Sequence, residues 1–290
     1  MLDIDDLTPE DLTAILDWAE VMPPPAIMSG RGAALIFEKP SNRTRNSTEM
    51  AVVGLGGHPV TIRAEEIGLG VREPIADVTK VLAQYHAVLG ARVFDHRVLE
   101  EMAALDAIPI VNLLSDVAHP CQALADLLTL RQHWGSLSGH TLAWVGDGNN
   151  VARSLTLAAA MAGIGVRLAC PAGHAIDEVA LDAARGYGAV EVAARPQDAV
   201  AGADVVVTDT WVSMGQEAES ASRADAFAGY QVDAELMAGA SPGAVFLHCL
   251  PAHRGEEVTG EVIDGPSSLV WTEAANRMHA ARGLLLWMLR

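Results

Sequence analysis

The chain alternates short runs of apolar residues with longer stretches in which apolar residues recur at helical spacing. In the first half, strands are predicted at residues 33–37, 59–63, 87–92 and 108–113, and helices near residues 9–19, 47–55, 74–85, 96–105 and 120–134. In the second half, strands are predicted at residues 141–146, 166–170, 190–193, 204–208 and 244–248, and helices near residues 151–163, 176–186, 197–201, 233–238 and 273–289. Alternating strands and helices are typical of parallel sheets covered by helices, so we predict an α/β fold.

The two series of elements meet at residues 136–139, which we take as the boundary between two lobes. We expect each lobe to be a parallel β-sheet flanked by helices. The first comprises residues 1–135, with the C-terminal helix (residues 273–290) returning to it, and the second comprises residues 136–272. In folds of this kind ligands bind at the carboxyl ends of the strands, so the segments that follow strands are the candidates for chemistry.

Charge and cysteine content narrow the class of protein. The 19 basic and 37 acidic residues give a formal net charge of −18, which disfavours nucleic acid as a partner. Three cysteines do not make a disulfide framework. The acidic start of the chain lacks the pattern of a signal peptide, and the longest apolar runs are too short to span a membrane. We therefore expect a cytoplasmic protein with no membrane partner.

One segment between a predicted strand and a predicted helix brings hydroxyl and guanidinium groups together. Residues 37–45 read Phe-Glu-Lys-Pro-Ser-Asn-Arg-Thr-Arg. Backbone N–H groups at a helix start, the positive end of the helix dipole and bidentate arginine donors together favour a phosphate. A solvated turn with two surface arginines is the alternative, and the segment alone does not decide between them.

Residues 119–122, His-Pro-Cys-Gln, have the pattern of a helix start. Proline at the first helical position puts His119 at the N-cap and Gln122 one turn later at the same end of the helix. Both side chains could then donate to a carbonyl oxygen or an anion. The alternative is an exposed histidine at an ordinary helix start.

Two further segments directly follow strands in the second half. Residues 209–215 read Asp-Thr-Trp-Val-Ser-Met-Gly, and residues 248–251 read His-Cys-Leu-Pro. An acid and a thiol at strand ends in one lobe are placed to hold a cationic amine, although a lone Cys249 is more often a small buried hydrophobe. His248, Cys249 and His253 also suggest a metal, but their spacing matches no zinc pattern and we predict no metal site.

Residues 146–151, Gly-Asp-Gly-Asn-Asn-Val, imitate a dinucleotide-binding fingerprint. A nicotinamide site needs a third small residue and an acidic side chain at the end of the next strand. Val151 takes the third position and the next strand ends Leu-Ala-Cys-Pro, so both marks are missing. We therefore predict no organic cofactor. Asn149 and Asn150 at a helix start instead suit a carboxylate.

Taken together and in this order, the segments resemble the ornithine carbamoyltransferases, whose pattern is Ser-Thr-Arg-Thr-Arg, His-Pro-x-Gln, Asp-x-x-x-Ser-Met-Gly and His-Cys-Leu-Pro, followed by a late glutamate and arginine. Here the last two are Glu273 and Arg277. The resemblance covers nearly the whole chain. It implies transfer of the carbamoyl group of carbamoyl phosphate to the δ-amine of L-ornithine, giving citrulline and phosphate. It also implies a first lobe for carbamoyl phosphate, a second for ornithine, and a homotrimer.

The resemblance carries over site residues by motif. Carbamoyl phosphate would be bound by Ser41, Asn42, Arg43, Thr44, Arg92, His119, Gln122, Cys249, Leu250 and Arg277. Ornithine would be bound by Asn150, Asp209, Ser213 and Met214. The catalytic residues would be Arg43, Arg92, His119, Asp209 and Cys249. In this scheme the arginines and the histidine stabilise the oxygen that gains charge, while Asp209 and Cys249 position the amine. Arg45 is expected beside the other arginines at the phosphate.

The sequence departs from the family pattern at two places. Asn42 replaces the usual threonine, and Gly68 stands where many relatives carry a polar residue, so no ligand is carried over to residues 65–74. Three alternatives stay open: a carbamoyltransferase for a related amine, a non-catalytic paralogue, and, least favoured, a nicotinamide-dependent oxidoreductase. The motifs at residues 209–215 and 248–251 favour free ornithine as the substrate.

Overall fold

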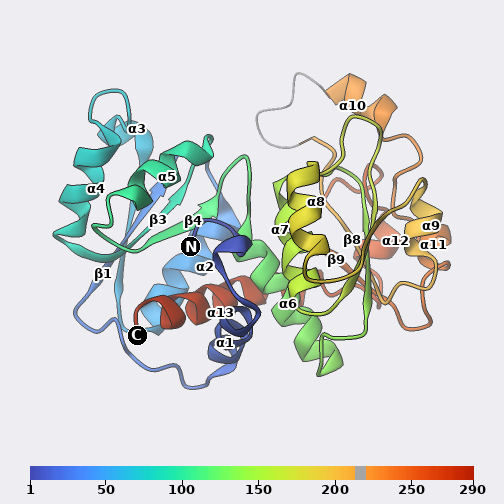
Figure 1. The fold of residues 1–290 in the computed structure, drawn as a ribbon, viewed down its shortest axis with the longest axis horizontal. Helices are drawn as coiled ribbons and strands as arrows, with labels where there is room; N and C mark the ends of the chain where they lie inside the picture. Colours follow the sequence, from blue (N-terminus) through green and yellow to red (C-terminus); the bar gives the residue numbers. More distant parts are fainter. Residues whose placement is uncertain (213–219) are drawn as a thin grey trace. The chain divides into compact units, whose positions relative to one another are not determined.

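The protein is represented by a computed structural model that describes residues 1–212 and 220–290 (Figure 1). The chain divides into two compact units. Unit 1 comprises Met1–Leu128 and Ala275–Arg290, and unit 2 comprises Thr129–Ala274. Both divisions fall inside long helices, α6 (Pro120–Trp134) and α13 (Val270–Met288), which therefore carry the chain from one unit to the other. Within the described ranges, no helix is long and apolar enough to cross a membrane.

Unit 1 is built on a four-stranded parallel sheet with the order β2-β1-β3-β4. The strands are β1 (Gly32–Phe37), β2 (His58–Arg63), β3 (His86–Arg92) and β4 (Ile110–Leu114). The other elements are η1 (Ile4–Asp6), α1 (Pro9–Glu20), α2 (Asn42–Gly54), α3 (Ala64–Ile67), α4 (Ile75–Ala83) and α5 (His96–Ala104). Phe37 pairs with Arg63 on one side and Arg92 on the other, so the carboxyl ends of β1, β2 and β3 lie level.

The C-terminal helix returns to unit 1, as predicted, and packs there on α1. Gly283 of α13 lies so close to α1 that a Cβ atom there would come within 2.3 Å of the Ile15 carbonyl oxygen. Two hydrogen bonds hold the contact: Arg282 donates to the Ala19 carbonyl oxygen (2.5 Å), and the Trp287 indole donates to Asp11 (3.1 Å). The glycine therefore permits the close approach that returns the end of the chain to unit 1.

Unit 2 is built on a five-stranded parallel sheet with the order β7-β6-β5-β8-β9. The strands are β5 (Thr141–Val145), β6 (Gly165–Ala169), β7 (Val190–Val192), β8 (Val205–Thr208) and β9 (Val245–His248). The helices are α7 (Asn150–Met161), α8 (Glu178–Arg185), α9 (Pro196–Val200), α10 (Ser220–Ala226), α11 (Ala234–Met237) and α12 (Gly260–Ile263). The strand order reverses between β5 and β8, which is where open α/β sheets bind ligands.

Both sheets are covered by helices, which confirms the predicted fold class. In unit 1, alternate residues of β1 and β3 pack on α4 and α5. In unit 2, α7 and α8 lie on one side of the sheet and α9, α11 and α12 on the other (Figure 1), where Val145, Val206 and Phe246 meet Val262 and Ile263. Each predicted strand matches an observed one to within two residues at either end. The helices η1, α3, α10 and α12 were not predicted.

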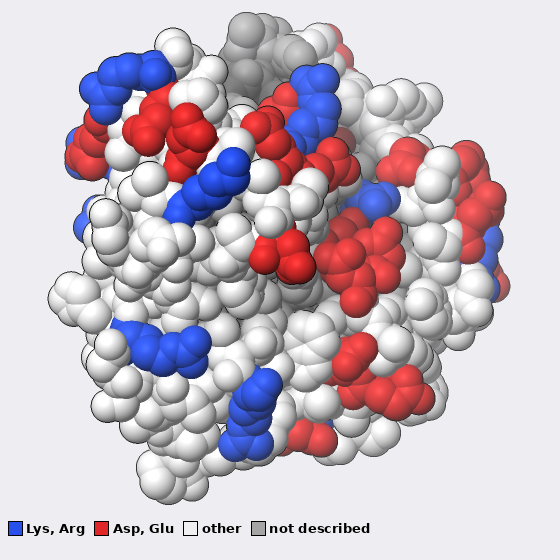
Figure 2. All heavy atoms as spheres, turned by 60° about the vertical axis from the view of Figure 1, so that its left-hand side comes forward, with Lys and Arg blue, Asp and Glu red and all other residues white. Residues whose placement is uncertain are grey.

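The net charge of −18 is not spread evenly over the surface. On the face shown in Figure 2, charged side chains stand in small groups, several of which contain both acidic and basic residues, with uncharged surface between the groups. At physiological ionic strength the Debye length is about 8 Å, so exposed charges farther apart than this are largely screened. The charges around a site therefore matter more to a small ligand than the total charge of the chain.

Candidate active site

In unit 1, the predicted phosphate segment forms the start of a helix at the carboxyl end of β1. Ser41 is the N-cap of α2, and its Oγ accepts a hydrogen bond from the Thr44 N–H (3.2 Å). The helix therefore begins five residues earlier than predicted, with Arg43 and Thr44 in its first turn. This turn presents backbone N–H groups and the positive end of a 13-residue helix beside the sheet.

Two arginines from distant parts of the chain meet at the Thr44 hydroxyl. Arg92, the last residue of β3, donates to Thr44 Oγ1 (3.3 Å), and Arg277 of α13 donates to the same oxygen (3.3 Å). Both arginines are buried, while Arg43 is half-buried. We call Arg43, Arg92 and Arg277 the arginine cluster. Three guanidinium groups gathered in a mostly buried place repel one another, and an anion bound among them would relieve that repulsion.

His119 lies beside the arginine cluster at the start of α6. It is 5% exposed, and its carbonyl oxygen accepts from the Gln122 N–H (3.0 Å), as expected of an N-cap residue. Burial holds the pKa of His119 well below 6.5, and the charges of Arg277, Arg92 and Arg43 lower this pKa further. The alternative of an exposed histidine is therefore wrong. The imidazole is neutral at pH 7 and can donate one hydrogen bond to an oxygen without adding a charge.

Gln122 is buried one turn later in α6, where Arg277 donates to its Oε1 and its Nε2 donates to Asp126 (2.7 Å). Five of the residues predicted to bind carbamoyl phosphate thus lie in one buried group: Thr44, Arg92, His119, Gln122 and Arg277. Asp126 joins this group although sequence reasoning did not single it out. Its spacing of four residues from Gln122 on a predicted helix was the signal available.

Arg45 does not join the arginine cluster. Its side chain is half exposed and pairs with Glu49 one turn along α2 (2.9 Å), and Thr61 also donates to Glu49 (2.5 Å). Because Arg43 and Arg45 are two positions apart on a helix, their side chains point to different sides. The prediction that Arg45 gathers with the other arginines at the phosphate is therefore wrong.

The two departures from the family pattern have local explanations. Asn42 is the exposed first residue of α2, and its side-chain oxygen accepts from Asn46 Nδ2 (3.0 Å). Gly68 ends α3 with φ of +62°, and a Cβ atom there would come within 2.6 Å of the Arg72 Cβ. Position 68 thus requires glycine for the turn, which is consistent with carrying over no ligand at this loop.

In unit 2, the loop after β5 and the residue after β8 meet at the switch point of the sheet. Asn149 caps α7 by accepting from the Val151 and Ala152 N–H groups (3.0 and 3.1 Å), and its amide donates to Asp209 Oδ2 (2.8 Å). Asn150, the residue predicted to bind ornithine, is the half-buried first residue of α7. Asn149, which was predicted together with Asn150 to suit a carboxylate, donates to the carboxylate of Asp209.

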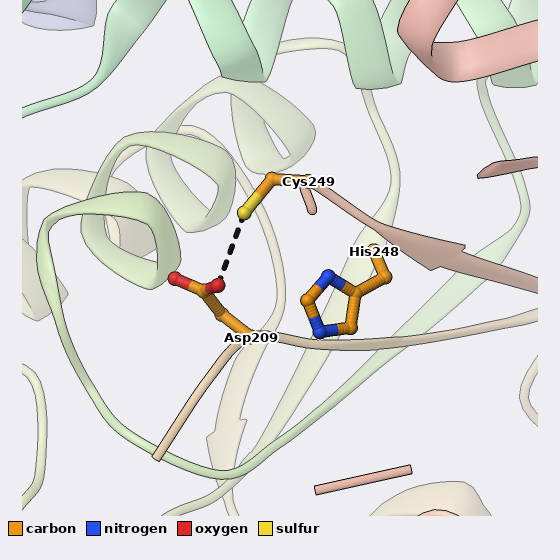
Figure 3. Close-up of side chains that lie close together, drawn as sticks. All are labelled: Asp209, His248 and Cys249. Carbon is orange, nitrogen blue, oxygen red and sulfur yellow. Dashed lines mark hydrogen bonds between the residues drawn. The ribbon is translucent and has the colours of Figure 1, made fainter. Parts of the chain in front are cut away.

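Asp209 and Cys249 are in direct contact (Figure 3). Cys249 Sγ donates to Asp209 Oδ1 (3.0 Å), and the Thr210 N–H donates to the same oxygen (2.7 Å). The contact follows from the sheet, because the preceding residues Thr208 and His248 are partners in the parallel pairing of β8 and β9. Asp209 is 6% exposed and lies at the end of a strand. Three donors, namely the Asn149 amide, the Thr210 N–H and the Cys249 thiol, hold its carboxylate in place.

The Asp209, His248 and Cys249 side chains place three potential ligand atoms within 4.8 Å of one another. Both ring nitrogens of His248 are nevertheless engaged. Nδ1 accepts from the Leu250 N–H (2.9 Å), so Nε2 carries the hydrogen and donates to the buried Glu257 (3.0 Å). This arrangement leaves His248 no lone pair for a metal ion. The same contact occupies the N–H group of Leu250, whose φ is +58°.

A buried ion pair links the two loops that carry Asn149 and Asp209. Arg223 of α10 donates to Asp147 Oδ2 (2.8 Å) and to the Trp211 carbonyl oxygen (2.8 Å). Burial raises the pKa of Asp147, and the Arg223 charge opposes that rise. Sequence reasoning missed this ion pair, because its two residues lie 76 positions apart and no local pattern connects them. Ser213 and Met214, the remaining predicted ornithine ligands, lie outside the described residues.

Comparison with known proteins agrees with this arrangement. The carbamoyl-P binding domain of aspartate/ornithine carbamoyltransferase matches residues 1–132, and the Asp/Orn binding domain of the same family matches residues 138–288. An ornithine carbamoyltransferase of Acidothermus cellulolyticus is 48% identical over 98% of this chain and 95% of its own length. The ornithine carbamoyltransferase structure from Thermus thermophilus is 44% identical with a TM-score of 0.92 and covers 100% of this chain and 98% of its own.

The structure from Pyrococcus furiosus is 43% identical with a TM-score of 0.94, covering 98% of this chain and 95% of its own. Family models thus match nearly the whole chain, and relatives above 40% identity match it end to end. The chain belongs to the aspartate/ornithine carbamoyltransferase family.

Proposed function

We propose that this chain is an ornithine carbamoyltransferase, which transfers the carbamoyl group of carbamoyl phosphate to the δ-amine of L-ornithine and releases citrulline and phosphate. The observation that carries the proposal is the buried group in unit 1, where the arginine cluster, the Thr44 hydroxyl and a neutral His119 meet at the first turn of α2. Few ligands other than a small phosphate compound suit so much positive charge at a helix start.

The phosphate group would lie at the first turn of α2. The Ser41 and Thr44 hydroxyl groups and the backbone N–H groups would bind its oxygens, and Arg43 and Arg92 would neutralise its charge. Asn42 would contribute its backbone within the same turn. His119 and Arg277 would donate to the carbonyl oxygen, which gains negative charge when the amine attacks. Because His119 is neutral, it stabilises that charge in the reaction without adding to the binding of phosphate itself.

The amine of ornithine would be positioned in unit 2. The carboxylate of Asp209 accepts an N–H of the amine, the Cys249 thiol holds that carboxylate in place, and the Leu250 carbonyl oxygen offers a second acceptor. Asn150, with Ser213 and Met214, would take the amino-acid end. Acceptors aimed at the amine orient its lone pair, and orientation supplies a large part of the acceleration in reactions of this type.

The reaction balances on the two substrates alone. The neutral amine attacks the carbonyl carbon, a C–N bond forms, and the carbonyl oxygen gains charge beside His119 and Arg277. The C–O bond to phosphate then breaks with its electron pair, and the departing phosphate takes up the proton that the amine loses. This assignment makes unit 1 the carbamoyl-phosphate domain and unit 2 the ornithine domain.

A substrate panel tests the proposal. Purified protein is incubated with carbamoyl phosphate and ornithine, putrescine, N-acetylornithine or aspartate, and the carbamoylated product and released phosphate are quantified. We expect equimolar citrulline and phosphate with ornithine and far slower product formation with the other amines. Preference for another amine would identify a related carbamoyltransferase, and a folded protein that carbamoylates none of them would be a non-catalytic paralogue.

We also propose a homotrimer that works in the reducing cytoplasm. The trimer rests on the family resemblance. The compartment rests on the cysteines, because all three are free thiols and Cys249 uses its thiol to hold Asp209. Size-exclusion chromatography with light scattering tests the first statement, with a monomer contradicting it, and cell fractionation tests the second.

A further inference from the structure

Gln122 is held between two groups of opposite polarity. Arg277 donates to its Oε1, and its Nε2 donates to Asp126 Oδ1 (2.7 Å). The side chains of Gln122 and Asp126 lie four residues apart on α6, and both residues are 1% exposed. The amide therefore takes its orientation from its protein neighbours rather than from solvent.

These neighbours permit a single orientation of the amide. A guanidinium group only donates hydrogen bonds, and a carboxylate only accepts them. A flipped Gln122 would turn its NH₂ group toward the donors of Arg277 and its oxygen toward the carboxylate of Asp126. Each flipped contact would leave buried polar groups facing groups of the same polarity, which is costly in a low-dielectric interior. Asp126 thus keeps Gln122 Oε1 on the side of Arg277.

That side is the one on which the proposed function places the ligand. Arg277 also donates to Thr44 Oγ1, the oxygen that Arg92 contacts, so Gln122 Oε1 lies at the edge of the arginine cluster. A carbonyl oxygen has two lone pairs and can accept from a ligand N–H as well as from Arg277. A carbamoyl group carries an NH₂ where an acetyl group of nearly the same shape carries a methyl. A hydrogen-bond acceptor at this point therefore favours a carbamoyl group over an acetyl group.

We propose that Asp126 is a positioning residue that makes this site select carbamoyl over acetyl phosphates, by holding the Gln122 oxygen toward the ligand. The inference rests on the proposed function for the identity of the ligand. It predicts that the preference for carbamoyl over acetyl groups requires the order of donors and acceptors along Asp126, Gln122 and Arg277. The presence of Gln122 alone is not enough.

Two stable phosphonates provide the test. Phosphonoacetamide and acetonylphosphonate both replace the bridging oxygen with a methylene, and they differ only in carrying NH₂ or CH₃. Isothermal titration should give a wild-type preference for phosphonoacetamide of about tenfold, as expected for one hydrogen bond to a buried acceptor. In Asp126→Asn the new amide can pair with either orientation of Gln122, so that only Arg277 still favours the native one, and the preference should fall below about threefold. Asp3→Asn, a change at another buried aspartate of unit 1 that caps η1, should keep the wild-type ratio.

A second pair of variants separates polarity from folding. Gln122→Glu places a carboxylate against Asp126 and should lose the preference. Combining it with Asp126→Asn restores a donor facing an acceptor, because the new amide can donate to one glutamate oxygen while the other faces Arg277, and the preference should return. A wild-type ratio in folded Asp126→Asn, or a double variant that discriminates no better than Gln122→Glu, would overturn the inference. No preference in the wild type would overturn it too. Wild-type preference without citrulline formation would instead overturn the proposed function alone.

Discussion

Arg223 offers the sharpest test of how unit 2 is held together. It forms a buried ion pair with Asp147 (2.8 Å), and both side chains are 8% exposed. Replacing Arg223 with methionine keeps much of the side-chain volume but removes the charge, so the Asp147 carboxylate stays buried without it. His174 Nδ1 lies 3.8 Å from the other carboxylate oxygen, which is beyond hydrogen-bond distance.

The expected cost follows from this geometry. Removing one partner of a buried pair typically costs about 3–5 kcal/mol, and the remaining 8% exposure of both side chains argues for the lower end, about 3 kcal/mol. A unit of this size loses roughly 2–4 °C of Tm per kcal/mol, so Arg223→Met should lower the Tm by roughly 6–12 °C at pH 8. Asp147→Asn introduced into the same variant should recover part of the loss, because it removes the uncompensated charge.

The pH dependence of this loss has a definite sign. Burial already raises the pKa of Asp147 above 3.8, and loss of Arg223 raises that pKa further. The folded variant therefore binds a proton at a pH where the unfolded chain does not, so its stability relative to the wild type increases as pH falls. The Tm difference should be smaller at pH 5.5 than at pH 8.

Thermal unfolding followed by circular dichroism checks these values. Arg195→Met is the matched control, because Arg195 forms an exposed pair with Asp198 (2.7 Å) and its loss should leave the Tm nearly unchanged. The same Arg223→Met protein should show a raised KM for ornithine, since Asp147 and Trp211 flank Asn149 and Asp209. An Arg223→Met protein as stable as Arg195→Met at pH 8 would refute the reasoning.

Three further predictions concern other parts of the molecule. Since the pKa of His119 is held well below 6.5 in the folded state, the unfolded chain protonates first, and stability should fall below pH 6.5 by up to about 1.4 kcal/mol per pH unit from this group. Urea unfolding at pH 7 and 5.5 should show a weaker pH dependence in His119→Asn, and an unchanged one would contradict the buried neutral state. Gly283→Ala should lower stability by about 1–3 kcal/mol by forcing α13 from α1, whereas Gly54→Ala, at the end of α2 with open space around it, should not; equal Tm values for the two variants would contradict the close packing. Cys249→Ala removes one donor to Asp209 and should reduce kcat/KM for ornithine by roughly tenfold in a citrulline assay, and unchanged kinetics would show that the thiol does not position the carboxylate.

Much of the fold could be predicted from local patterns. Runs such as Val-Val-Val-Thr before Asp209 predict buried parallel strands, and the residues that follow these strands proved to meet at the sheet edges. The cluster of hydroxyl and guanidinium groups around Ser41, Arg43 and Thr44 predicts a helix start, and the structure places all three at the cap and first turn of α2. These patterns involve residues that are close in sequence, so they can be recognised without knowing how the chain packs.

The remaining parts of the site depend on contacts between distant residues. Arg92 and Arg277 meet at Thr44 across 48 and 233 positions, which no spacing rule detects without the family resemblance. Whether an arginine of α2 joins the arginine cluster depends on the face of the helix from which it projects. Arg45 projects from another face than Arg43 and pairs with Glu49. Arg223 and Asp126 were overlooked because they act through other residues. Arg223 pairs with Asp147, and Asp126 accepts from Gln122.

The most direct measurement of the central claim is citrulline formation by the wild type and by Arg43→Ala at saturating ornithine, with circular dichroism to verify the fold. Arg43 lies in the first turn of α2, where its charge acts on His119 and is expected to act on the phosphate. The account predicts robust turnover by the wild type and loss of citrulline formation in a folded Arg43→Ala protein. Turnover by Arg43→Ala at the wild-type rate would contradict it.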